Sequence, residues 1–205
     1  MAAALSAATA EPHVCVVPMD PSHGSAIIAI QRSIYPNALH EDVSLILARA
    51  SLFPAGSLVA LDAAPPHDVL AYASAYPYPA ALALASPPSL GELDPALIVA
   101  ALAHPADACL FVHEVSVYAQ GRGIGGLFMK RLLGLAGVMG LSSAVLVSVL
   151  GNRGYYLKLG FSLVRSLPDY AVAEGLQLAE AEPPLQPTPS FYSTLREADV
   201  MHMRL

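Results

Sequence analysis

The sharpest chemical signal in the sequence is a cluster of four glycines within residues 120–126 (QGRGIGG). The cluster follows an apolar run at 109–117 that predicts a strand, and it precedes a run at 124–139 with helical spacing. Glycines let the backbone turn tightly against a ligand, and the first turn of a helix adds unpaired N–H groups and a positive dipole end. The segment therefore predicts a pyrophosphate-binding loop rather than a merely mobile turn.

Three kinds of phosphate site compete for this loop. A nucleoside triphosphate P-loop requires Gly-Lys-Ser or Gly-Lys-Thr, which the loop lacks. A dinucleotide site requires an acidic residue about twenty positions later, and residues 141–149 hold no carboxylate. Coenzyme A, which also carries a pyrophosphate, is the remaining alternative.

The strand before the loop carries two titratable residues, His113 and Glu114, inside an apolar run. A carboxylate buried there would have a raised pKa, and an imidazole titrates near neutral pH, so either could act as a general base. Strand alternation places the two side chains on opposite faces, so we expect only one of them to face a substrate. Each could equally be a hydrogen-bonded structural side chain.

Gln120, Gly123 and Gly125 match the phosphate loop of the GNAT superfamily of acetyl-CoA-dependent N-acetyltransferases, in which Gln or Arg, two residues, Gly, any residue and Gly or Ala follow one another. Residues 156–161 (YLKLGF) resemble the Tyr-x-Lys-x-Gly-Phe ending of that family, and residues 113–117 (HEVSV) resemble its His-Asp-Leu-Ala-Leu strand. The motifs occur in the order of the family. The resemblance extends over most of the chain from about residue 13.

The resemblance implies that the pantetheine arm of acetyl-CoA lies between two splayed strands and pairs with the backbone of the strand at 114–117. An amine would then attack the acyl group directly, and the leaving thiolate would be protonated. Asn152 lies four positions before the motif tyrosine, where the family usually has seven. The coenzyme-binding residues implied are Val115, Ser116, Val117, Gln120, Gly121, Arg122, Gly123, Ile124, Gly125, Gly126 and Asn152.

The resemblance also suggests catalytic roles. Tyr156 falls on the tyrosine position of the family and is the candidate acid that protonates the thiolate. It could instead be an aromatic core residue, with the adjacent Tyr155 facing the ligand. Glu114 is the candidate base, and His113 is its rival.

The acceptor amine would need a carboxylate to attract it and aromatic rings to cover its carbon frame. Candidate acceptor-binding residues are Tyr35, Glu41 and Tyr76. Glu41 is also well suited to the start of a helix, which would be a purely structural role. The predicted reaction is transfer of an acetyl group from acetyl-CoA to a primary amine, and small amines of the polyamine or arylalkylamine type are the leading acceptors. The alternatives are a protein amino group as acceptor and a non-catalytic acyl-CoA-binding module.

The predicted elements alternate between strands and helices around one sheet. Strands are predicted over 13–17, 57–62, 69–76, 109–117, 143–149, from 161 and over 200–205, and helices over 21–34, 41–53, 95–103, 124–139 and 153–159. Residues 77–107 form a proline-rich insertion. The fold class expected is α/β (α+β), a GNAT-like domain with a single twisted, mixed and mainly antiparallel sheet flanked by helices, over residues 11–205 after a disordered tail at 1–10.

The composition limits the classes of binding partner that we expect. Ten Lys and Arg and a formal net charge of −6 give no basic surface for nucleic acid. Hydrophobic residues make up 55% of the chain, yet glycines or prolines interrupt both long uncharged stretches, 132–152 and 69–91, so we expect no membrane span. The histidines lack metal-ligand spacing, so no metal is predicted.

Cys15 and Cys109 each lie in an apolar run, which predicts two buried small side chains and favours a reducing, cytoplasmic compartment. The expected partners are therefore acetyl-CoA and a small-molecule amine. A homodimer is compatible with the sequence.

Overall fold

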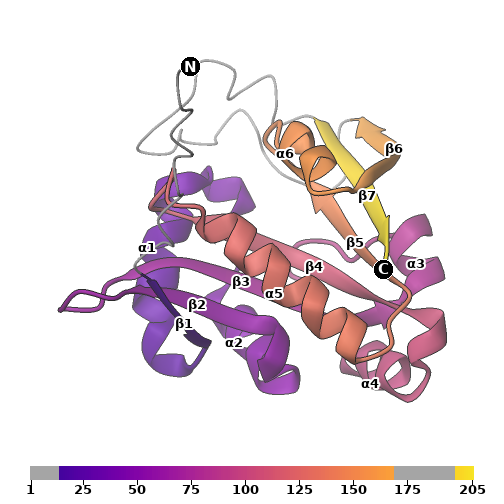
Figure 1. Cartoon of the computed structure of the whole chain (residues 1–205), viewed down its shortest axis with the longest axis horizontal. Coiled ribbons are helices and arrows are strands. Elements are labelled where there is room, and N and C mark those ends of the chain that lie inside the picture. The colour runs from indigo at the N-terminus through magenta and orange to yellow at the C-terminus, as the bar shows by residue number, and fades with distance from the viewer. Residues whose placement is uncertain (1–13, 169–196) are drawn as a thin grey trace, which may run out of the picture.

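The computed structural model describes residues 14–168 and 197–205. The tail predicted at 1–10 lies outside the described residues, as does most of the segment that follows the strand predicted from 161. In the described part, one sheet (Figure 1) has the strand order β1 (Val14–Pro18), β2 (Ser57–Asp62), β3 (Val69–Pro79), β4 (Ala108–Val117), β5 (Ser143–Ser148), β7 (Glu197–Arg204) and β6 (Ser162–Pro168). Neighbouring strands are antiparallel, except that β4 and β5 are parallel.

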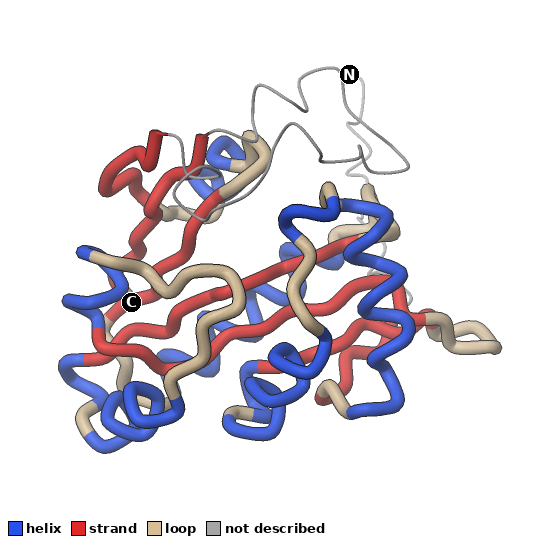
Figure 2. The backbone as a smooth tube through the Cα atoms, turned by 180° about the vertical axis from the view of Figure 1, so that it is seen from behind, coloured by secondary structure: helices blue, strands red, loops and turns tan. Residues whose placement is uncertain are grey.

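Helices cover both faces of the sheet. On one face lie α1 (Gly24–Ile34) and α2 (Val43–Leu52), which pack on β2 and β3 through an apolar cluster that includes Ile27, Ile46 and Tyr72. The loop between α3 (Ala80–Ala85) and α4 (Pro95–Ala103) crosses this same face (Figure 2). The opposite face is covered by α5 (Ile124–Val138), and α6 (Arg153–Lys158) precedes β6.

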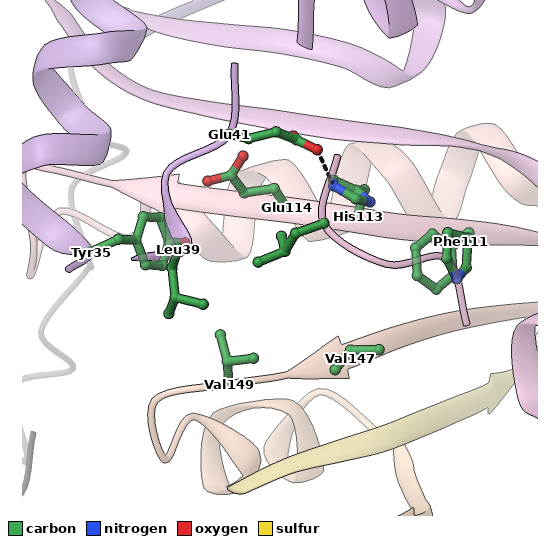
Figure 3. Close-up of a pocket in the computed structure, with 10 residues that line it drawn as sticks. Tyr35, Leu39, Glu41, Phe111, His113, Glu114, Val147 and Val149 are labelled. Carbon is green, nitrogen blue, oxygen red and sulfur yellow. Dashed lines mark ion pairs between the residues drawn. The ribbon is translucent and has the colours of Figure 1, made fainter. Parts of the chain in front are cut away.

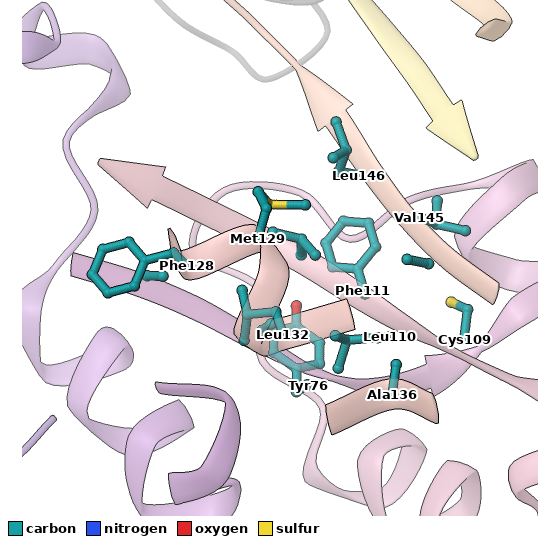
Figure 4. Close-up of a cluster of buried hydrophobic side chains, with 14 of the residues drawn as sticks. Tyr76, Cys109, Leu110, Phe111, Phe128, Met129, Leu132, Ala136, Val145 and Leu146 are labelled. Carbon is teal, nitrogen blue, oxygen red and sulfur yellow. The ribbon is translucent and has the colours of Figure 1, made fainter. Parts of the chain in front are cut away.

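The larger core lies between the sheet and α5 (Figure 4). Phe128, Met129 and Leu132 of α5 are fully buried there, in one apolar cluster with strand residues such as Leu110 of β4. These side chains recur at helical spacing, which is why the sequence predicts this helix correctly. The mixed, mainly antiparallel sheet flanked by helices confirms the predicted fold class.

Two local predictions were wrong. β3 continues through Pro77 and Pro79 instead of ending at residue 76, and α3 follows it directly. The two prolines are tolerated because β2 pairs with β3 only as far as Ser74, so beyond it β3 has an edge where a missing N–H breaks no ladder bond. Cys15 is exposed on the edge strand β1, whereas Cys109 is buried as predicted.

Candidate active site

β4 and β5 separate at the centre of the sheet. Their register runs from Cys109 opposite Ser143 to Val112 opposite Leu146 and ends there, whereas β4 stays paired with β3 as far as Val117. Within the described sheet, the edge of β4 at 113–117 that faces β5 therefore has no strand partner. Its backbone groups are available to an extended ligand that adds to the sheet like another strand.

A cleft opens at this gap. It is bounded by the end of β4, the glycine loop, the first turn of α5, the segment after β5, and α6. All predicted coenzyme-binding residues line it except Arg122, whose Nη1 donates a hydrogen bond to Oδ2 of Asp62 at 3.0 Å. The lining consists of Ile34, Tyr35, Val115, Ser116, Val117, Gln120, Gly121, Gly123, Ile124, Gly125, Gly126, Leu150, Asn152, Tyr155 and Tyr156.

The glycine loop is shaped for contact through its backbone. Gly121 and Gly123 have φ angles of 77° and 72°, the left-handed region that other residues rarely adopt. Gly123 is the N-cap of α5, and its carbonyl accepts a hydrogen bond from the N–H of Leu127 at 3.1 Å. The N–H groups before Leu127 in the first turn have no acceptor within the helix. Such a turn fits an anionic group such as a pyrophosphate.

Tyr155 and Tyr156 both line the cleft, from α6. The Tyr156 ring lies between those of Tyr155 and Phe161, with centroid distances of 5.1 and 5.9 Å. Burial raises the pKa of Tyr156, so its phenol stays protonated at neutral pH. The Tyr155 hydroxyl lies over the first turn of α5, where a Cβ added to Gly125 would be 3.0 Å away. The two tyrosines therefore face different parts of one cleft.

A separate pocket lies where β4 faces the segments around α1 and α2 (Figure 3). It shares Tyr35 with the cleft. Its lining comes from the end of α1, the segment before α2, the loop between α3 and α4, β4, and the end of β5. The residues are Tyr35, Leu39, Glu41, Pro88, Leu90, Phe111, His113, Glu114, Val147 and Val149.

His113 and Glu114 both line this pocket, so the prediction that strand alternation places the two side chains on opposite faces was wrong. The reason is a β-bulge: Ser74 pairs with Glu114, but the next residue, Ala75, pairs with Val112. His113 is the extra residue of β4, and the bulge interrupts the alternation of side chains. Simple alternation along the sequence could not reveal this insertion.

Glu114 is the centre of a partly buried hydrogen-bond network. Its Oε1 accepts hydrogen bonds from Tyr72 Oη at 2.5 Å and from Ser116 Oγ at 2.7 Å. Ser116 Oγ is also 2.9 Å from Tyr35 Oη. Burial raises the pKa of Glu114 above its ordinary value, although these two hydrogen bonds partly oppose the rise. Sequence reasoning missed Tyr72, because its partner lies 42 positions away.

Glu41 lies just before α2 and is held by an ion pair. Both of its carboxylate oxygens accept hydrogen bonds from Arg49, and its Oε1 lies 3.3 Å from Nε2 of His113. Burial alone would raise the pKa of Glu41, but His113 and Arg49 outweigh it and lower the pKa, so the carboxylate stays ionised. The N-cap of α2 is Asp42. Arg49 was also missed, although a lone cation in an apolar helix is a recognisable signal for a buried partner.

Tyr76 lies outside the pocket that holds Glu114. It lines a neighbouring pocket with Tyr78, Glu92 and Asp94, and its Oη is 3.4 Å from Nδ1 of His113. Burial raises its pKa. Tyr76 therefore adjoins the pocket that holds Glu114 through His113 and Phe111 without lining it.

In residues 14–168 and 197–205, no group of three or more His, Cys, Asp and Glu side chains is arranged to hold a metal ion. No helix in them combines the length and apolar character needed to cross a bilayer.

Comparison with known proteins gives similarity in structure only. No protein-family model and no curated protein matches the chain. The polyamine N-acetyltransferase of Drosophila melanogaster aligns with a TM-score of 0.59 at 18% identity, over 94% of this chain and 100% of the other. Naa20 of Chaetomium thermophilum, solved with a bisubstrate analogue, aligns with a TM-score of 0.63 at 15% identity, over 93% and 86%.

The loading GNATL domain of CurA from Lyngbya majuscula aligns with a TM-score of 0.64 at 11% identity, over 93% of this chain and 97% of the other. These neighbours share one architecture with this chain. Their alignments cover nearly all of this chain. The chain therefore has the fold of the GNAT acetyltransferases.

Proposed function

We propose that this protein transfers an acetyl group from acetyl-CoA to a primary amine. One observation carries the proposal: the backbone-lined cleft and the carboxylate-containing pocket adjoin along β4 and share Tyr35. An acyl donor in the cleft and an amine in the pocket would meet beside Glu114. The cleft without the pocket, or the pocket without the cleft, would not support an acetyl transfer.

The donor half rests on the fit of the glycine loop to a pyrophosphate. The N–H groups of 123–126 would hold the phosphates, and the unpaired edge of β4 at 113–117 would hold the pantetheine arm. Acetyl-CoA supplies the thioester-bound acetyl group. Backbone N–H groups along the same edge are the candidates to polarise the acyl carbonyl.

The acceptor half rests on Glu114. An amine arrives mostly as an ammonium ion, and it must lose a proton before its nitrogen can attack. The raised pKa of Glu114 makes its carboxylate a stronger base than an exposed glutamate, which suits it to take that proton. His113 lies in the same pocket but faces Glu41, so we assign it to positioning that carboxylate.

Tyr156 is the proposed acid. A nitrogen–carbon bond forms, the carbon–sulfur bond breaks, and a proton must reach the sulfur. Tyr156 lines the cleft, and its phenol is protonated at neutral pH because burial raises a pKa that is already well above 7. Tyr155 lines the cleft as well, but its hydroxyl lies beside Gly125 in the first turn of α5.

The decisive experiment measures CoA release from acetyl-CoA against a panel of alkylamines, arylalkylamines, polyamines, amino acids and peptides. We expect release with at least one amine, and a thermal shift with acetyl-CoA that NAD and ATP do not match. A ligand at about 100 times its dissociation constant stabilises the fold by about 2.7 kcal/mol. Stabilisation by acetyl-CoA without CoA release for any amine would instead support a non-catalytic acyl-CoA-binding module.

A further inference from the structure

The loop between α3 and α4 closes one side of the pocket that holds Glu114, which is the proposed acceptor pocket. Its residues Pro88 and Leu90 line the pocket. Leu90 belongs to an apolar cluster with Leu39, Tyr35 and Leu150. Because Leu39 precedes α2 and Leu150 follows β5, this cluster joins segments from both sides of the gap between β4 and β5.

A buried ion pair holds this loop in place. The N–H of Gly91 donates to Oε1 of Glu41 at 2.9 Å, and Nη2 of Arg49 donates to the carbonyl of Glu92 at 2.9 Å. Arg49 is fully buried, and Glu41 is 8% exposed. The pocket wall is therefore fixed to the core through backbone hydrogen bonds, which limits the room for an extended polypeptide.

The charges inside the pocket are few. Among the described residues, its lining has two carboxylates, and that of Glu41 is committed to Arg49 and Gly91. Glu114 is the remaining one. The carboxylates of Glu92 and Asp94 line a different pocket, which shares only Pro88 with this one. The rest of the lining is mainly apolar: Leu39, Pro88, Leu90, Phe111, Val147 and Val149.

One positive charge can thus be matched at Glu114, while a second would have to lie among aliphatic and aromatic side chains. Leaving a charge unpaired in such surroundings is costly. From this distribution we infer that the acceptor is a monoamine with a compact apolar body, and that polyamines and polypeptides are disfavoured. The inference rests on the proposed function and names the substrate class of the same site.

A matched pair of amines tests the inference. Hexylamine and 1,5-diaminopentane have the same number of heavy atoms, and they differ in whether a methyl group or an ammonium ends the chain. We expect calorimetry on the CoA-saturated protein to show hexylamine binding at least about tenfold more tightly, a difference of about 1.4 kcal/mol. A tetrapeptide with a free amino terminus should bind more weakly than hexylamine.

Equal or tighter binding of the diamine or the tetrapeptide would overturn the inference, and so would the absence of binding by all three. Hexylamine that binds, while neither it nor any amine of the panel releases CoA from acetyl-CoA, would leave the pocket assignment intact and contradict the proposed function instead. The two failures are therefore distinguishable.

Val149→Asp provides a second test, because it places a carboxylate at the apolar end of the pocket. We expect it to shift the ratio of the two affinities toward the diamine by about tenfold. The matched control is Val164→Asp on the edge strand β6, where the side chain is 45% exposed and the ratio should not change. An unchanged ratio in a folded Val149→Asp protein contradicts the inference, and if that variant does not fold, the comparison on the unaltered chain still decides.

Discussion

The proposed coenzyme cleft and the proposed acceptor pocket adjoin, yet they are built in different ways. Most of the cleft comes from one continuous stretch, 115–126, which presents backbone groups and glycines. The pocket is assembled from side chains of five segments, and a β-bulge and an ion pair orient them. A backbone-built site depends on local conformation, whereas a site built from side chains depends on how distant segments pack.

The largest expected effect falls on the backbone-built site. Gly125→Val should abolish acetyl-CoA binding, because its Cβ would meet the Tyr155 hydroxyl at 3.0 Å and its methyl groups would occupy the anion site. Calorimetry with acetyl-CoA checks this. The control is Gly134→Ala, in the same helix, where an added Cβ meets nothing within 4 Å. A folded Gly125→Val protein with normal affinity would show that the loop does not hold the phosphates.

Tyr156→Phe tests the chemistry where the two sites meet. It removes a hydroxyl and keeps the ring that packs on Phe161, so acetyl-CoA affinity and stability should change little. Positioned proton transfer contributes about 10² to 10⁴-fold, and we expect kcat to fall by that order. Tyr155→Phe should retain most of the activity. If steady-state kinetics give the reverse result, the acid is Tyr155, and if neither variant loses activity, no tyrosine here protonates the thiolate.

The buried ion pair between Glu41 and Arg49, which orients the side chains of the pocket, should contribute strongly to the stability of the fold. Glu41→Gln leaves the Arg49 charge uncompensated, so we expect the free energy of unfolding at pH 7 to fall by about 3–5 kcal/mol. The pKa of Glu41 is lowered in the folded state, so its contribution is present above the unfolded pKa of about 4.5 and is lost as the pH falls below it. Urea unfolding measures both effects.

Asp62→Asn is the matched control, because it weakens the partly exposed pair with Arg122 at the edge of the cleft. Such pairs contribute at most about 1 kcal/mol. A Glu41→Gln protein as stable as Asp62→Asn would mean that the ion pair does not fix the pocket wall.

The smallest expected effect is a displaced pH profile. Since Glu114 must be ionised to act as a base and its pKa is raised, kcat/KM should increase with pH around a midpoint above 4.5, the ordinary value for glutamic acid. Glu114→Gln should remove that ionisation from the profile and lower kcat. A profile that is unchanged in the variant would assign the base to another group, with His113 the first to test.

The sequence was informative where function depends on local backbone. The helix at 124–138, the strand before it and the glycine loop were predicted with nearly correct bounds, because apolar periodicity and glycine each act within a few residues. β3 was predicted too short at Pro77, because the prediction could not see that this part of the strand lies beyond the end of β2.

By itself, the sequence determined the order of most strands and helices, the position of the glycine turn before α5 and the types of residue available for acid–base chemistry. Only the tertiary structure decided which of them meet. In the tertiary structure His113 and Glu114 line one pocket, and Glu41 forms an ion pair with Arg49. Tyr76 lines a neighbouring pocket instead. The physical reason is that side-chain direction depends on strand register and on charge pairing across the fold, and neither is encoded in spacing along the chain.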